Sequence, residues 1–369
     1  MVEQERVPAA TATAMGKVLV TGGAGHLGAN LVRRLLADGV SVRTLVRRDS
    51  NNAALQGLDV EWCFGDLRDP EATELAVRGC SHVYHCAASL STVYGGVAAA
   101  REIYESNVLG TRNLLRAARL ARVTRVVVTG SFSATGYDLD DPSRPANETM
   151  PFFPFARPLP YEQSKALAEH EVLKAFADGL DVVVATSCAI LGPHDHKPSR
   201  MGQVLCDFAR GRVPAYIPGG FEFVAARDIV QGHVLAMARG RAGQKYIIAT
   251  RFCTMDELMG WFEQVTGRRR PRLRLPPALM AGIAEVMTPV LSRLRPHAPQ
   301  RLTPGAVRIL RMQRHADCSK ARQELGYEPT DIVDAIREAY EDFVRRGLIE
   351  RPRTATGVKP ETTAPAASG

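Results

Sequence analysis

The sequence predicts a doubly wound α/β fold, with a parallel sheet covered by helices on both faces and a smaller, mostly helical C-terminal lobe. Short β-branched runs such as KVLVTG, SVRTLV and RVVVTG alternate with stretches of helical periodicity, including Ala29–Asp38 and Val108–Ala121. Strands that alternate with helices at this spacing are typical of parallel sheets built from crossover connections. After about Leu191 the alternation weakens and Pro, Gly and Arg become more frequent, which indicates the second lobe.

The composition of the chain suggests how it is divided. Residues 1–16 are polar and rich in Ala and Thr, and 351–369 are rich in Pro, Ala and Thr, so we expect a flexible leader and a disordered tail. Between them, 17–190 are expected to form the sheet domain, with a chain return near 223–238. Residues 191–350 are expected to form the second lobe. A chain of 369 residues is long enough for two such domains.

Charge and cysteine content exclude several classes of protein. The chain has 47 Lys and Arg against 39 Asp and Glu, and this net charge of +8 is too mild and scattered to require a nucleic-acid partner. Seven dispersed cysteines without a CxxC pair predict free thiols in a reducing compartment. The chain has no long apolar run to span a membrane, and its N-terminus lacks the apolar core of a secretory signal. We therefore expect a cytoplasmic protein.

A glycine-rich loop follows the first strand. Lys17–Thr21 leads directly into TGGAGHLG, in which Gly22, Gly25 and Gly28 precede a helix. Such glycines allow a tight turn, a close approach of the backbone to a diphosphate and close packing of helix on strand, while the helix N-terminus offers free N–H groups. The alternative is a purely structural turn. The pattern favours a Rossmann-type dinucleotide-binding domain over 17–190.

The end of the second strand indicates which dinucleotide is bound. An acidic residue there would hold the ribose hydroxyls of NAD(H), but the strand ends in Leu-Val-Arg47-Arg48 with no acid before Asp49. A guanidinium attracts a 2′-phosphate, so NADP(H) is favoured and NAD(H) is the alternative. Arg47 and Arg48 could instead be a solvated strand end. Asp66, after the third strand, could accept a hydrogen bond from the adenine amino group or simply form a turn.

A Tyr and a Lys predict the catalytic centre. Tyr161 and Lys165 lie four residues apart, and on a helix they share one face. The ammonium is expected to lower the pKa of Tyr161, which would then exchange a proton with a carbonyl oxygen. A serine segment, VVVTGSFSATG, ends an upstream strand, and Ser131 is expected to hydrogen-bond the carbonyl. Ser133 is the rival for this role and Thr129 is third. The alternative for Tyr161 is an exposed residue at a helix start.

Several motifs occur in an order that resembles a known superfamily. They are TGGAGHLG, HCAA (His85–Ala88), SNVLGT (Ser106–Thr111), TGSFSA, YEQSK and LGPHD (Leu191–Asp195). This order resembles the extended short-chain dehydrogenases/reductases, in the branch with dihydroflavonol reductases, 3β-hydroxysteroid dehydrogenases and hopanoid-associated epimerase-like proteins. The segment Asp317–Pro329 is similar to their C-terminal signature, and the resemblance covers about 16–345.

The resemblance implies roles for individual residues. It makes Ser131, Tyr161 and Lys165 the catalytic triad, with Asn107 as a polar group at a helix start behind the site. It also implies cofactor contacts from the glycine loop, the second strand, the adenine side and the ribose side: Gly22, Gly25, His26, Leu27, Gly28, Arg47, Asp66, Leu67, Ala87, Ala88 and Ser89. The chain departs from the family pattern at Gly130-Ser131, at Ala185–Cys188, which lacks a common proline, and at Phe223–Asp228. Substrate contacts are therefore expected to differ.

The substrate side is expected to be apolar. The candidate substrate contacts are Tyr94, Ser133 and His194, although Tyr94 could equally cover the core. His194 and His196 could suggest a metal site, but no third ligand is suitably spaced, so none is predicted. The stretch 268–301 combines a basic run with apolar residues at helical spacing (Leu279, Ile283, Val286, Val290 and Leu294). It could be a packed helix, a lid over a hydrophobic substrate, or a peripheral membrane contact. A homodimer is also compatible with the sequence.

Together these features predict an NAD(P)H-dependent reductase that transfers hydride to a ketone of a hydrophobic small molecule, with Tyr161 as the proton donor. The alternative enzyme is an NAD-dependent nucleotide-sugar epimerase or dehydratase, which the missing acid at the second strand disfavours. A non-catalytic dinucleotide-sensing protein is the third hypothesis. Such proteins tend to lose the Tyr and Lys, and both residues are present here.

Overall fold

The computed structural model describes residues 16–89, 96–138, 140–141, 143–152, 159–294 and 304–350. The expected leader (except Gly16), the expected tail and Tyr94 lie outside the described residues.

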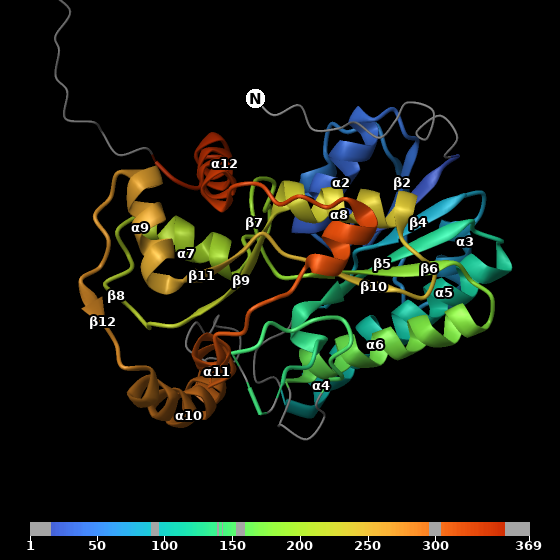
Figure 1. Ribbon diagram of the computed structural model, residues 1–369. Helices are drawn as coiled ribbons and strands as arrows, with labels where there is room; N and C mark the ends of the chain where they lie inside the picture. Colours follow the sequence, from blue (N-terminus) through green and yellow to red (C-terminus); the bar gives the residue numbers. More distant parts are fainter. Residues whose placement is uncertain are drawn as a thin grey trace, which may run out of the picture.

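A seven-stranded parallel sheet forms the centre of the larger lobe, which confirms the predicted fold class (Figure 1). Its strand order is β10-β6-β5-β4-β1-β2-β3. The strands are β1 (Val18–Thr21), β2 (Val42–Val46), β3 (Glu61–Phe64), β4 (His82–His85), β5 (Arg125–Ser131), β6 (Val182–Ser187) and β10 (Lys245–Ile248). The order reverses between β1 and β4, and ligands of open α/β sheets bind at such a switch point.

Helices cover both faces of this sheet. In Figure 1, α2 (His26–Ala37) and α8 (Ala226–Arg239) lie above it, whereas α3 (Pro70–Val77), α5 (Gly110–Leu120) and α6 (Pro160–Ala177) lie below it. Successive residues of a strand point to opposite faces. Val18 and Val20 accordingly pack in the cluster under α2 and α8, and Leu19 packs in the cluster on the other face. The continuous apolar runs of the strands are thus explained by burial on both sides.

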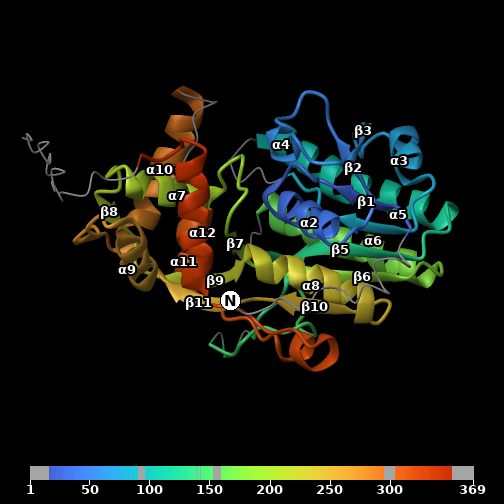
Figure 2. The ribbon, with the colours of Figure 1, turned by 90° about the horizontal axis from the view of Figure 1, so that it is seen from above.

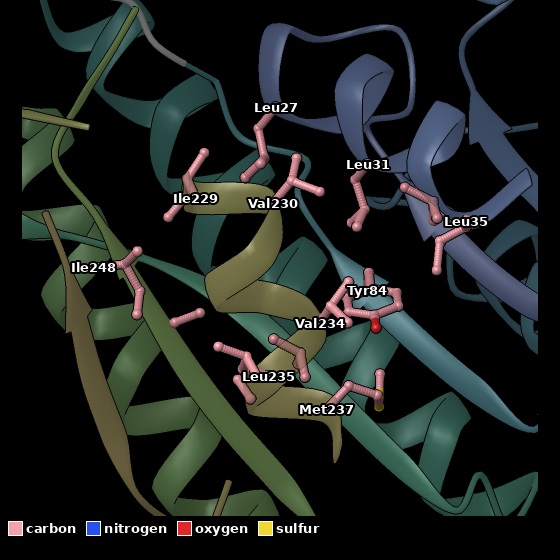
Figure 3. Packing of buried hydrophobic residues seen from close by; sticks show 14 of the residues in the cluster. Leu27, Leu31, Leu35, Tyr84, Ile229, Val230, Val234, Leu235, Met237 and Ile248 are labelled. Atoms are coloured by element: carbon pink, nitrogen blue, oxygen red, sulfur yellow. The ribbon is translucent and has the colours of Figure 1, made fainter. Parts of the chain in front are cut away.

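The first of these clusters joins two helices that are far apart in the sequence. Leu27, Leu31 and Leu35 of α2 face Val230 and Val234 of α8, and all are buried (Figure 3). The chain therefore returns to the sheet domain over 226–248, a longer stretch than the expected 223–238. The difference arises because the short run Lys245–Ile248 pairs in parallel with β6 and adds an edge strand.

The second lobe has its own core and lies to one side of the large sheet (Figure 2). A three-stranded sheet has the order β11 (Arg251–Thr254), β9 (Gly220–Ala225) and β7 (Ala189–Leu191). It packs with three helices, α7 (Arg200–Ala209), α9 (Met255–Thr266) and α12 (Ile332–Arg345).

Five further elements complete the α-helices and strands of the described chain: the paired strands β8 (Ala215–Tyr216) and β12 (Leu273–Arg274), and the helices α4 (Gly96–Tyr104), α10 (Pro277–Leu294) and α11 (Pro304–Met312).

Helix α10 packs on α11 but leaves an apolar face uncovered. Leu279 and Val286 are 59% and 68% exposed, and Ile283 is also exposed, whereas Ala284 is fully buried. Leu279, Ile283 and Val286 therefore lie outside the packed side of α10, which contains Ala284 instead. The lid and the membrane contact stay predictions. No helix of the described ranges is long and apolar enough to cross a membrane.

Candidate active site

A cavity of about 580 Å³ lies at the carboxyl ends of the large sheet's strands and extends to the second lobe. One end is formed by Arg47, Ser50 and Asn52 after β2, and the other by the ends of β5 and α6. The cavity brings together fourteen of the residues singled out in the sequence: Gly22, Gly25, His26, Leu27, Gly28, Arg47, Asp66, Leu67, Ala87, Ala88, Ser89, Ser131, Tyr161 and Lys165.

The three glycines of the loop have different structural requirements. Gly22 has a φ of +70°, and a Cβ there would lie 2.7 Å from the backbone N of Ala87. A Cβ on Gly28 would lie 2.2 Å from the Gly22 carbonyl oxygen. Gly25 differs because it is exposed to the cavity, and its Cβ would meet only the Gly22 oxygen, at 3.2 Å. Close packing of the backbone therefore requires glycine at positions 22 and 28, whereas the absence of a side chain at Gly25 leaves space for a ligand beside the start of α2.

The start of α2 fits the diphosphate of a dinucleotide. Its N-cap residue, Gly25, has no side chain to cap the helix, and the first turn carries no acid, so the backbone N–H groups are left for a ligand. His26 Nε2 lies 3.1 Å from the Pro193 carbonyl oxygen, while its buried Nδ1 has no hydrogen-bond partner. Burial lowers the pKa of His26. The loop thus presents the positive end of the helix dipole and an uncharged imidazole to an anion.

At the adenosine end, the two candidate residues differ in their surroundings. Arg47 is half-exposed, and its Nε lies 3.9 Å from Asp49. Asp66 accepts hydrogen bonds from the Arg68 guanidinium at 2.7 and 3.0 Å and from the Arg68 N–H at 2.9 Å. These bonds lower the pKa of Asp66, which is consequently ionised and neutralised by Arg68 rather than free.

At the opposite end, the candidate catalytic side chains form a connected set. The Ser131 hydroxyl lies 2.8 Å from the Ser133 hydroxyl and hydrogen-bonds the Tyr161 phenol. Lys165 Nζ donates to the Thr129 carbonyl oxygen at 2.6 Å. Tyr161 and Lys165 share a face of α6, as their spacing requires. The Thr129 hydroxyl pairs with His233 instead, at 2.8 Å.

Burial dominates the electrostatics of this end. It lowers the pKa of Lys165 to about 8, although Glu169 acts to raise it. It raises the pKa of Tyr161, with the Ser131 hydrogen bond acting in the opposite direction. In this arrangement the Lys165 ammonium is bonded to the Thr129 carbonyl, and desolvation of the phenolate determines the direction of the Tyr161 pKa shift. The expected lowering of the Tyr161 pKa by Lys165 stays a prediction. Tyr161 is a protonated phenol at neutral pH.

Asn107 supports the site without lining the cavity. Its amide donates to Ser164 Oγ at 2.9 Å and to the Ser89 carbonyl at 3.0 Å, and its Oδ1 accepts from the Ser89 N–H at 2.7 Å. Ser164 precedes Lys165, so Asn107 ties the ribose-side loop to α6. The expected helix-start position is wrong: Asn107 lies in a π-helical turn (Glu105–Leu109) between α4 and α5, inside one continuous helix.

Two predicted substrate residues are not among those that line the cavity. Ser133 reaches it only through Ser131, and the His194 backbone N–H donates to Asp342 on α12 at 3.0 Å. Ser50, Asn52, Lys197 and Ser199, which belong to none of the motifs, do line it, and so does Asp195 at the end of LGPHD. The polar runs after Val46 and after Gly192 were the only signals for them in the sequence. Within the described part of the chain, no group of three His, Cys, Asp or Glu side chains is placed to hold a metal ion.

Comparisons with known proteins agree with this geometry. A family model described as the NAD-dependent epimerase/dehydratase family matches residues 18–249. The chain is 43% identical to "Sterol demethylase protein B" of Methylococcus capsulatus, over 90% of this chain and 99% of that protein. It is 34% identical to a "Putative dihydroflavonol 4-reductase" of Synechocystis, over 90% and 95%. The crystal structure of DesIV, a dTDP-glucose 4,6-dehydratase from Streptomyces venezuelae with NAD and TYD bound, is 27% identical over 90% and 99%, with a TM-score of 0.72.

The different requirements of the glycines can be tested directly. We expect Gly25→Ala to weaken binding of both NADP⁺ and NAD⁺ about tenfold, because its methyl group occupies the place of a diphosphate oxygen at the helix start. The melting temperature should change little, since the new Cβ meets only one oxygen. Titration calorimetry and thermal unfolding measure the two effects.

Gly28→Ala is the control, because its Cβ clashes with the Gly22 carbonyl and the fold itself should be destabilised. Undiminished dinucleotide binding by Gly25→Ala would contradict the assignment of the loop.

Proposed function

Because the chain belongs to the NAD-dependent epimerase/dehydratase family, within the extended short-chain dehydrogenases/reductases, we propose that it transfers hydride between NADP(H) and a hydroxyl or ketone of a hydrophobic ring compound. As a member it is an NAD(P)-dependent oxidoreductase. The observation that carries the proposal is the single cavity that joins the glycine loop to Ser131, Tyr161 and Lys165.

The class of substrate is inferred from the relatives and from the lining of the cavity. The names of the relatives refer to a sterol and a dihydroflavonol, which are both compounds with several rings and a large hydrocarbon skeleton. Beyond Ser131, the cavity is lined by Cys188, Ala189 and Ile190, which suit such a surface. These residues occupy and follow the strand end that lacks the common proline. A ketone of a steroid- or terpenoid-like ring fits this description better than a sugar diphosphate.

In the proposed mechanism, Tyr161 gives its phenolic proton to the substrate oxygen in the direction of reduction. The cofactor, when bound, supplies the hydride. Ser131 hydrogen-bonds the substrate oxygen as negative charge develops on it, and Ser133 orients the Ser131 hydroxyl. Lys165 stabilises the phenolate that remains, and its ammonium can also hold the ribose hydroxyls. The raised pKa of Tyr161 keeps its proton in place until the substrate binds.

The exposed face of α10 is proposed as a contact with an anionic membrane surface, from which a hydrophobic substrate could be drawn. Leu279, Ile283, Val286 and Met287 are exposed on this helix. The exposed arginines 268, 269, 270, 272 and 274 precede the helix directly. An apolar face beside a cationic run suits the interface of acidic lipids.

The central test of the proposed activity is Tyr161→Phe. Wild type should oxidise NADPH in the presence of hydrophobic ring ketones, and the variant should lose about a hundredfold or more of kcat, because the proton donor is gone. Its NADPH binding should be retained. Tyr104→Phe, on the exposed part of α4, is the matched control and should keep full activity.

Turnover by Tyr161→Phe at the wild-type rate would contradict the mechanism. A wild type that instead keeps NAD tightly bound during turnover and never oxidises added NADPH would favour the epimerase or dehydratase alternative over the proposed reductase. Absence of any turnover would favour the non-catalytic alternative.

The membrane proposal predicts that the protein sediments with vesicles that contain phosphatidylserine but not with pure phosphatidylcholine. The double variant Leu279→Ser, Val286→Ser should reduce the bound fraction severalfold without loss of melting temperature, since both side chains are exposed. Equal sedimentation of wild type and variant would contradict it. So would a dimer in solution that the variant dissociates, because a second copy would then cover this face.

A further inference from the structure

We propose that Lys197 and Ser50 form, with Arg47, the site that recognises the 2′-phosphate of NADP(H), so that the two lobes together choose the cofactor. This inference rests on the proposed use of NADP(H) and extends it to residues outside the known motifs. Lys197 Nζ donates to Ser50 Oγ at 2.7 Å, and both side chains line the cavity at the end where Arg47 lies.

The position of Lys197 is fixed by the backbone on either side of it. The Pro193 carbonyl oxygen accepts a hydrogen bond from Asn30 on α2 at 2.8 Å, beside its contact with His26. The Asp195 carboxylate accepts from the Ser199 N–H at 2.7 Å, and the Asp195 carbonyl accepts from Arg346 at 3.0 Å. The segment 193–199 is therefore tied both to the helix of the glycine loop and to α12. These bonds hold the segment so that Lys197 lines the cavity.

The loop after β2 is tied in the same way. The Ser50 N–H donates to the Arg47 carbonyl at 3.3 Å, and the Asn52 amide donates to the same oxygen at 2.9 Å. This turn ties the Ser50 backbone to that of Arg47, and both residues line the same end of the cavity. Arg48 is directed elsewhere, since its guanidinium stacks on the Phe64 ring, 4.3 Å from the centroid. Of the two arginines, only Arg47 lines the cavity.

The charges at this end favour a dianion. Within the described part of the chain, no carboxylate lies within 4 Å of Lys197. The only one this close to Arg47 is the exposed Asp49, at 3.9 Å, and Asp66 acts on Arg47 from farther away. Of the acidic residues that line the same cavity, Asp66 is engaged by Arg68 and Asp195 by the Ser199 N–H, whereas the third, Glu102, is exposed and acts on Arg68. An ammonium, a guanidinium and a hydroxyl donor can each take one oxygen of a phosphate monoester. The 2′-hydroxyl of NAD(H) could accept a hydrogen bond from one of these three donors, but it would leave both positive charges without a counter-charge.

The test compares binding of NADP⁺ and NAD⁺, and of the fragments 2′,5′-ADP and 5′-AMP, by titration calorimetry. Lys197→Met should weaken NADP⁺ and 2′,5′-ADP tenfold or more, as expected for the loss of a charge-assisted hydrogen bond, and should leave NAD⁺ and 5′-AMP within about twofold. Ser50→Ala should act in the same direction but less strongly. Lys197→Arg should retain most of the preference.

Lys174→Met is the matched control, because this exposed lysine pairs with Glu171 on α6, and it should change none of the four affinities. An equal loss for NADP⁺ and NAD⁺ in Lys197→Met would overturn the proposal, as would no loss for either. If wild type binds NAD⁺ more tightly than NADP⁺, the 2′-phosphate site is also overturned. Turnover that depends on Tyr161 with NAD(H) would still leave the proposed reaction standing.

Discussion

One close approach determines where a cofactor can lie in this protein. The Gly22 carbonyl oxygen occupies the space that any side chain at position 28 would need, so helix α2 begins directly against the end of β1. The same turn brings Gly22 against the backbone of Ala87, which follows β4. The switch point of the sheet and the free N–H groups of α2 therefore meet at one place. The cavity runs from there to the catalytic end in one direction and to Arg47 in the other.

At the end of the cavity where Tyr161 and Lys165 lie, burial determines the pKa shifts. The desolvated Tyr161 remains a phenol, and Lys165 has a pKa of about 8 while it is held by the Thr129 carbonyl. Both effects suit a site that gives up a proton when a substrate oxygen gains negative charge. Asn107 ties Ser164 of α6 to the Ser89 backbone from behind the cavity, which helps to hold the neighbouring Lys165 in place.

The sequence predicted the sheet and most of the candidate site because both follow from local patterns. Strand ends and glycine spacings are read along the chain, and parallel strands bring their ends to one edge. The return of β10 was underestimated because a run of four residues carries little periodic signal. Lys197 and Ser50 were missed because their contact depends on the path of the second lobe over the first, which no spacing encodes. The direction of the Tyr161 pKa shift could not be predicted from spacing for a similar reason, since burial is a property of the packed structure. The exposed face of α10 has the same periodicity as a buried one, so periodicity alone could not separate them.

A crystal structure of the protein with NADP⁺ tests this account most directly. We expect the diphosphate to rest on the N–H groups at the start of α2, beside Gly25, with the nicotinamide ring next to the Tyr161 hydroxyl and the 2′-phosphate between Arg47 and Lys197. A dinucleotide bound in the opposite direction, or a nicotinamide ring remote from Tyr161, would contradict it.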